Sequence, residues 1–101
     1  MVISIKQAEL LARSELERIT QGSNDKLDIM PEHTIVRPLV CAFFYQSQEY
    51  ILTQEFSSQL VGHGPLLINR STGEILSAGS YPSPEIQIQE LEQKISRMRN
   101  L

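Results

Sequence analysis

The sequence predicts an α+β domain in two layers, with a helix at each end of the chain and an antiparallel meander of three to four strands between them. Apolar residues recur at helical spacing near both ends, and the middle of the chain holds short β-rich runs separated by turn residues. A chain of 101 residues suits one core and leaves little room for two. We therefore expect residues 1–101 to form a single domain.

The first predicted element is a helix that begins after Ser4. Ser4 and Gln7 have the spacing of a capping box, in which the serine accepts from a backbone N–H and the glutamine reaches back. Gly22 is expected to end the helix. Apolar residues repeat on one helical face at Ile5, Ala8, Leu11, Ala12, Leu16 and Ile19.

Short strands are expected in the middle of the chain. Residues 27–30 read as a short edge strand limited by Pro31, and residues 34–37 as a second strand. Residues 39–45 form a continuous apolar run of strand length, and we expect 46–59 to extend that strand and then become a long loop. Residues 65–69 and 74–78 are predicted to pair as a hairpin, with Gly73 at positive φ in the turn.

The last predicted element is a helix that begins after Ser83. Ser83 supplies a capping hydroxyl, Pro84 suits the first helical position, and Glu85 places an acid in the first turn. A narrow apolar stripe follows at Ile88, Leu91, Ile95 and Met98. The stripe is expected to pack on the sheet, although its width also suits a coiled-coil seam.

Composition restricts the function classes. The net charge of −3 is too mild and of the wrong sign for a nucleic-acid binder. Residues 25–59 carry five acids and two bases, and such an acidic middle favours a basic partner or is ordinary solvated surface. The N-terminus lacks a signal-peptide pattern and no apolar run is long enough to span a membrane, so we expect a cytoplasmic protein without a membrane partner.

The reactive side chains do not form a recognisable catalytic pattern. Cys41 is the only cysteine, and its place in the most apolar run suggests an inert buried thiol rather than a nucleophile activated by His33 or His63. The two histidines have no cysteine or carboxylate at ligand spacing, so no metal is expected. Gly62-His63-Gly64 lacks the further residues of a phosphate loop. We therefore expect neither an enzyme nor a cofactor.

The apolar run of residues 39–45 raises the question of what buries its second face. A strand with one face in water alternates apolar and polar residues, and residues 39–44 do not alternate. Two helices on one side of a sheet would leave the other face of this strand uncovered. The cover could be the loop around Ile51, Leu52 and Phe56, a second copy of the chain in a homodimer, or a foreign partner.

The stretch from Gly62 to Ile75 resembles the signature of the immunity protein 35 family, also called the YrhB domain. Members typically carry Gly-Asn-x-Pro, an apolar strand, a turn ending in Gly and a second strand, and here Gly62, Pro65 and Gly73 occupy those places. His63 stands where the family usually has asparagine, and the usual tryptophan before the aromatic strand is missing. The resemblance runs from about residue 27 to residue 91.

The resemblance implies a bacterial immunity protein that binds and neutralises a cognate toxin by covering its active site or substrate groove. Such families accompany polymorphic toxins and secretion-system effectors of several chemistries, papain-like peptidases among them. The alternative is a free-standing YrhB-like binding module with chaperone or housekeeping work. For toxin binding, the predicted contacts are Tyr45, Glu49, Tyr50, Glu55, Phe56, His63 and Tyr81.

Overall fold

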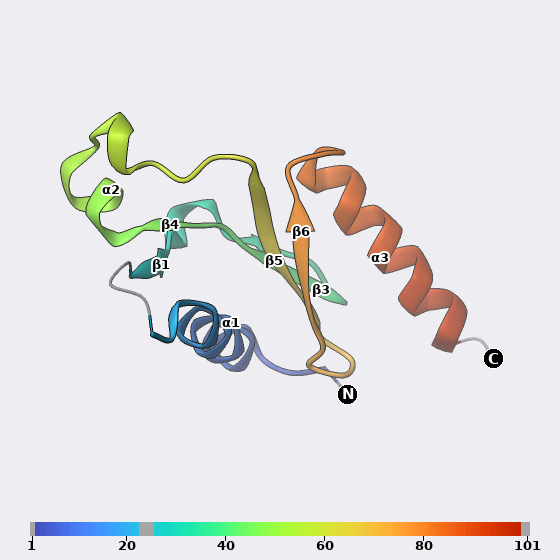
Figure 1. The fold of residues 1–101 in the computed structure, drawn as a ribbon. Helices are drawn as coiled ribbons and strands as arrows, with labels where there is room; N and C mark the ends of the chain where they lie inside the picture. The colour runs from blue at the N-terminus through green and yellow to red at the C-terminus, as the bar shows by residue number, and fades with distance from the viewer. Residues whose placement is uncertain (1, 23–25, 100–101) are drawn as a thin grey trace.

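A four-stranded antiparallel sheet lies between two long helices (Figure 1). The computed structural model describes residues 2–22 and 26–99. The sheet has the order β2-β3-β5-β6, and β1 pairs with β4 in a separate two-stranded sheet. The described elements are α1 (Ile5–Thr20), β1 (Leu27–Ile29), η1 (Pro31–His33), β2 (Ile35–Val36), β3 (Val40–Phe43), β4 (Tyr45–Ser47), α2 (Gln48–Thr53), η2 (Phe56–Ser58), β5 (His63–Asn69), β6 (Ile75–Gly79) and α3 (Pro84–Arg99).

The α+β class, the terminal helices and the antiparallel meander are confirmed, but the layering differs from the prediction. Cys41 and Phe43 of β3 pack with α1, whereas Val40 and Ala42 pack with α3. Alternate residues of one strand face opposite sides of a sheet, so the two helices cover opposite faces. The layers are helix, sheet and helix, where two layers were expected (Figure 1).

This layering shows what buries the second face of β3. The second face of β3 is covered by Ile88, Leu91 and Ile95 of α3. Neither the loop, nor a second copy, nor a foreign partner is needed to bury it, so all three explanations offered from the sequence were wrong. The error lay in placing both helices on one side of the sheet, because helical periodicity shows which face of a helix is apolar but not which face of a sheet it meets.

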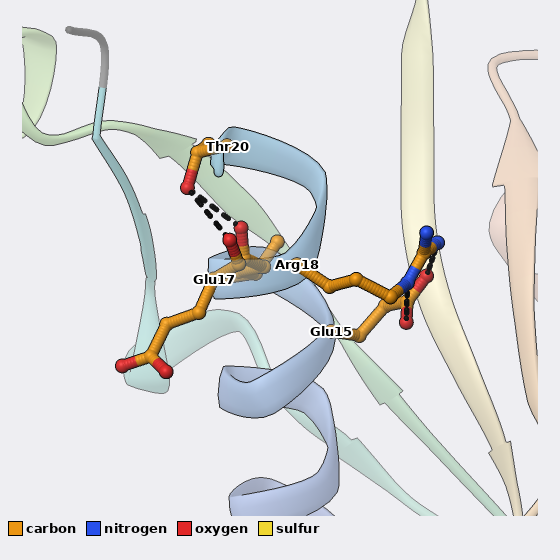
Figure 2. A network of polar contacts seen from close by, with 5 residues as sticks. Glu15, Glu17, Arg18 and Thr20 are labelled. Atoms are coloured by element: carbon orange, nitrogen blue, oxygen red, sulfur yellow. Dashed lines mark hydrogen bonds and ion pairs between the residues drawn. The ribbon is translucent and has the colours of Figure 1, made fainter. Parts of the chain in front are cut away.

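The capping box predicted at Ser4 is present. The Gln7 N–H donates to the Ser4 hydroxyl at 3.1 Å, and the Ser4 N–H donates to the Gln7 side chain at 3.0 Å. At the other end of α1, the Thr20 hydroxyl donates to the Leu16 carbonyl at 2.9 Å (Figure 2). The helix ends at Thr20 with Gln21 as its C-cap, and Gly22 follows at φ 84°, in the left-handed conformation typical of the residue that ends a helix, as predicted.

An exposed ion pair also closes the last turns of α1 (Figure 2). The Arg18 guanidinium donates to both Glu15 carboxylate oxygens, at 2.9 and 2.5 Å. These hydrogen bonds, with the attraction of the two charges, hold the pKa of Glu15 below its usual value. Because Arg18 lies in solvent, the pair adds little to the stability of the fold.

The apolar run of residues 39–45 is not one strand. It divides at Phe44, whose carbonyl accepts a hydrogen bond from the Met30 N–H at 2.8 Å. The chain beyond this point leaves β5 and pairs with β1 instead, with Tyr45 opposite Ile29. The pairing partner changes through contacts distant in sequence, which a local pattern does not show.

The expected extension of that strand beyond Ser47 is wrong, because α2 begins there. The Ser47 hydroxyl accepts from the Tyr50 N–H at 3.1 Å, and Glu49 lies in the first turn, where an acid favours a helix. Gln54 ends the short helix in the left-handed conformation, at φ 61°. The long predicted loop is thus reduced to the residues around η2.

The remaining strand and turn predictions hold within a residue or two, but Ile5, Ile19 and Met98 of the predicted apolar stripes are 47%, 45% and 66% exposed and so lie at the edges of the buried faces. β5 begins at His63 rather than at residue 65, β6 spans Ile75–Gly79, and Gly73 has φ 82° in the hairpin turn. Helix α3 begins at Pro84, as expected. Among the described residues, no helix is long and apolar enough to cross a membrane.

Candidate partner-binding site

Residues 48–62 connect β4 of the two-stranded sheet with β5 of the four-stranded sheet, and we call them the 48–62 segment. Figure 1 shows this segment, with α2 and η2, projecting beyond the end of the sheet, away from α3. The segment projects because the pairing of β3 with β5 stops at Phe43, and the next strand, β4, pairs with β1. The segment thus lies outside the helix–sheet–helix core, where the chain can expose side chains without disturbing that core.

Two buried polar side chains anchor the 48–62 segment. The Gln46 side chain donates to the Leu60 carbonyl at 2.8 Å and accepts from the Leu60 N–H at 2.9 Å, as a neighbouring strand would. The Ser47 hydroxyl donates to the Ser58 carbonyl at 2.5 Å. Gln46 and Ser47 are 7% and 9% exposed, so their hydrogen bonds form in a largely dry environment, where leaving them unmade is costly.

The 48–62 segment exposes large apolar side chains. Leu52, Phe56 and Val61 are 78%, 84% and 82% exposed. Single exposed apolar residues are ordinary, but three so fully exposed on one short projecting segment are typical of a surface that a partner covers. Leu52 and Val61 were not predicted as contacts.

The charge of the 48–62 segment is negative. It contains Glu49 and Glu55 and no lysine or arginine. Both glutamates are exposed, and neither takes part in an ion pair among the described residues. In the rest of the predicted acidic middle, the charge of Asp28 is neutralised by Arg13, whose guanidinium lies 2.8 Å from the Asp28 carboxylate. Asp25 lies outside the described residues.

A hollow of about 250 Å³ lies where the 48–62 segment rejoins the sheet. Its lining comes from β4, from the start of β5 and from the connection between β6 and α3. Tyr45 and His63 meet there, with ring centroids 4.6 Å apart. The His63 Nε2–H donates to the Tyr45 carbonyl at 3.0 Å, and the buried Nδ1 has no hydrogen-bond partner among the described residues.

Tyr45 lines this hollow but is only 8% exposed. Burial raises the pKa of its phenol, and hydrogen bonding with Ser77 opposes that rise. A side chain so enclosed offers a partner little surface. It packs in the core between the sheet and α1, and its ring and carbonyl contact His63.

The other predicted contacts divide into two groups. Glu49, Tyr50, Glu55 and Phe56 all belong to the 48–62 segment. Tyr81, 89% exposed, lies apart from them on the connection between β6 and α3, which borders the hollow. Tyr50 is half-buried and lines a second hollow with Glu32 and His33 of η1.

The described residues do not assemble a reaction centre around the cysteine. Cys41 is completely buried in the core between the sheet and α1. Burial raises the pKa of its thiol, an effect that the charge of Arg70 partly opposes, so the reactive thiolate is disfavoured. Within residues 2–22 and 26–99, no group of three or more histidine, cysteine or acidic side chains is placed to hold a metal ion.

Comparison of the sequence with models of known protein families shows the family to which the chain belongs. The family described as Immunity protein 35 matches residues 6–88 of the 101 residues. The chain belongs to the immunity protein 35 family. Searches of curated proteins and of solved structures return no match.

The match to the immunity protein 35 family extends the resemblance seen in the sequence. It takes in nearly all of α1, the whole sheet, the 48–62 segment and the start of α3. Membership indicates an immunity function and implies a cognate toxin as partner. The 48–62 segment therefore lies within the part of the chain that defines the family.

Proposed function

We propose that this protein is an antitoxin that binds a cognate toxin effector through the 48–62 segment and covers the toxin's active site or substrate groove. The observation that carries the proposal is the exposure of Leu52, Phe56 and Val61 on a projecting segment of a chain from an immunity family. Large apolar side chains of this kind are the anchors that dominate the energy of interfaces.

The negative charge of the 48–62 segment indicates what kind of partner surface it fits. Glu49 and Glu55 flank the apolar anchors without a basic neighbour on the segment. Acidic groups beside an apolar centre favour a basic rim on the partner, and they speed the encounter more than they strengthen the complex. The proposed place of action is the cytoplasm, and a papain-like peptidase effector of a polymorphic toxin system is the toxin class to test first.

The test is co-expression with the toxin encoded beside this gene, followed by co-purification and a growth assay. We expect a stoichiometric complex and rescued growth. Phe56→Ser removes an anchor that is 84% exposed, so it should leave folding intact and raise the Kd by roughly thirtyfold or more. Leu10→Ser is the matched control, because Leu10 is 57% exposed but belongs to α1, away from the segment.

Two outcomes would contradict this proposal. Equal losses of binding for the Phe56 and Leu10 variants would show that the 48–62 segment has no special part in the interface. A chain that neither binds nor protects against the neighbouring toxin would instead fit the free-standing YrhB-like binding module considered from the sequence. Circular dichroism of each variant separates lost binding from lost folding.

A further inference from the structure

The two edges of the four-stranded sheet are built differently. One edge is β2, which has only two residues and is followed by Arg37 and Pro38. A short strand that ends near a charge and a proline gives another strand little to pair with. The other edge is β6, whose five residues contain neither a charge nor a proline. Such an edge is a ready template for a further strand.

The backbone of β6 presents free hydrogen-bonding groups at this edge. The Asn69 N–H donates to the Glu74 carbonyl at 2.9 Å, which fixes the alternation of the β5–β6 ladder. In an antiparallel ladder only every second residue bonds to the neighbouring strand. The N–H and C=O groups of Ile75 and Ser77 therefore turn away from β5, and within residues 2–22 and 26–99 no further strand meets them.

A groove runs beside this edge, between β6 and α3. It encloses about 300 Å³, and its floor is apolar, with Leu67, Leu76 and Leu91. Leu76 is 40% exposed although it lies in a strand. Glu90 and Lys94, one turn apart on α3, form the outer lip of the groove.

We propose that β6 pairs with β6 of a second copy of this chain, which makes one continuous sheet across a two-fold axis. The pairing is antiparallel, as a two-fold axis normal to the sheet requires. Leu76 lies opposite Leu76 of the second copy, and Ile75 exchanges backbone hydrogen bonds with Ser77 of that copy. This register uses the outward groups of β6 and covers the exposed side chain of Leu76.

Charge selects a second copy rather than another strand. The two-fold axis keeps both copies of α3 on the same face of the sheet and runs them in opposite directions. Glu90 of one copy then faces Lys94 of the other, and the reverse pair forms at the same time. The lip of the groove is thus complementary to itself, which is the condition for a closed two-fold interface. The inference does not depend on the toxin.

Disulfide trapping tests the register. Paired residues without mutual hydrogen bonds have Cα atoms roughly 4.5 Å apart, which suits a disulfide. Leu76→Cys is therefore expected to give a covalent dimer under mild oxidation. Ser77→Cys is the control, because its two copies would lie roughly 8 Å apart and should not be bridged. The native Cys41 is buried and stays out of the reaction.

Sedimentation tests the interface itself. The parent chain should sediment as a concentration-dependent dimer, and Leu76→Lys should raise the dimer Kd by roughly tenfold or more, because like charges would face each other. Glu90→Lys should weaken the dimer, and the double variant Glu90→Lys with Lys94→Glu should restore it. The circular dichroism spectrum should stay unchanged in all three variants.

Several results would overturn the pairing. These are a monomeric parent chain, equal cross-linking of the two cysteine variants, or a dimer that survives Leu76→Lys. A monomer whose toxin binding is lost in Leu76→Lys would show that a toxin strand occupies the edge. Loss of toxin binding in Phe56→Ser with an intact dimer would leave the pairing standing, so the two proposals fail separately.

Discussion

The helix–sheet–helix core and the 48–62 segment handle apolar side chains in opposite ways. In the core, β3 is buried on both faces, with α1 on one side and α3 on the other. In the segment, Leu52, Phe56 and Val61 are each more than three-quarters exposed. Exposing such side chains costs free energy that burial would have gained, roughly 1.5–3 kcal/mol for each. The core is thus built for stability, and the segment carries surface that only a partner would bury.

The junction between these regions is narrow. Gln46 and Ser47 hold the segment on one side, and the start of β5 receives it on the other. Variants at this junction therefore test whether the two regions are separable.

Gly64→Ala is expected to have the largest effect, because it strikes the core at the start of β5. An added Cβ would overlap the Gly79 carbonyl oxygen and lie 2.7 Å from that of Ala78, and both are backbone atoms of the neighbouring strand. The strands would have to separate, so the free energy of unfolding should fall by more than about 3 kcal/mol. Urea unfolding measures this loss.

Gly62→Ala is the matched control for Gly64→Ala. Gly62 lies on the segment side of the junction and has φ 80°, with nothing within 4 Å of an added Cβ. Only the left-handed backbone opposes alanine there, so the expected loss is about 1–2 kcal/mol. Equal losses at the two glycines would contradict the contrast between a packed core and an open segment.

Gln46→Leu is expected to release the 48–62 segment while the core stays folded. Leucine fills similar space but leaves the Leu60 N–H and C=O without their partners, at a cost of about 1–3 kcal/mol. Amide hydrogen exchange should accelerate at Leu60 and in the residues before it, and should stay slow in β3 and β5. Faster exchange throughout β5 would show instead that segment and core unfold as one unit.

The sequence predicted the core elements well because their signals are local. The capping box at Ser4, the hairpin turn at Gly73 and the Ser83-Pro84 start of α3 each depend on neighbours a few residues away. The apolar spacing along α3 likewise identified Ile88, which is completely buried.

The junction was missed because its causes are distant in sequence. The apolar run of residues 39–45 divides into β3 and β4 at Phe44, whose carbonyl accepts from the Met30 N–H, and no pattern within the run predicts this division. Gln46 reads as an ordinary polar residue until Leu60 is placed beside it. Helix α2 did have a local signal, the Ser47 cap, but the polar residues around it favoured a loop.

The contact residues were predicted in part. Glu49, Glu55 and Phe56 are exposed on the 48–62 segment, as an interface requires, although their contact with a toxin stays a prediction. Tyr45 is buried, because the aromatic run that seemed to offer it to a partner turns toward β1 instead. Exposure depends on the path of the chain through space, which composition does not give.

Tyr45→Phe is expected to have the smallest effect: it loses the hydrogen bond of the phenol with Ser77, worth roughly 0.5–1.5 kcal/mol, and it changes how the free energy of unfolding depends on alkaline pH. Burial raises the pKa of Tyr45 in the folded state, so its stabilising contribution is complete below the unfolded pKa of about 10 and is lost as pH rises through the folded value. The free energy of unfolding of the parent should therefore fall more steeply above pH ~10 than that of Tyr45→Phe. Thermal unfolding at a series of alkaline pH values measures the two slopes.

Tyr81→Phe, at an 89% exposed position, is the control and should keep the parent's slope, and Cys41 is present in all three proteins. Parallel slopes for the parent and Tyr45→Phe would mean that the phenol is open to water, so that the junction is looser than the core it adjoins.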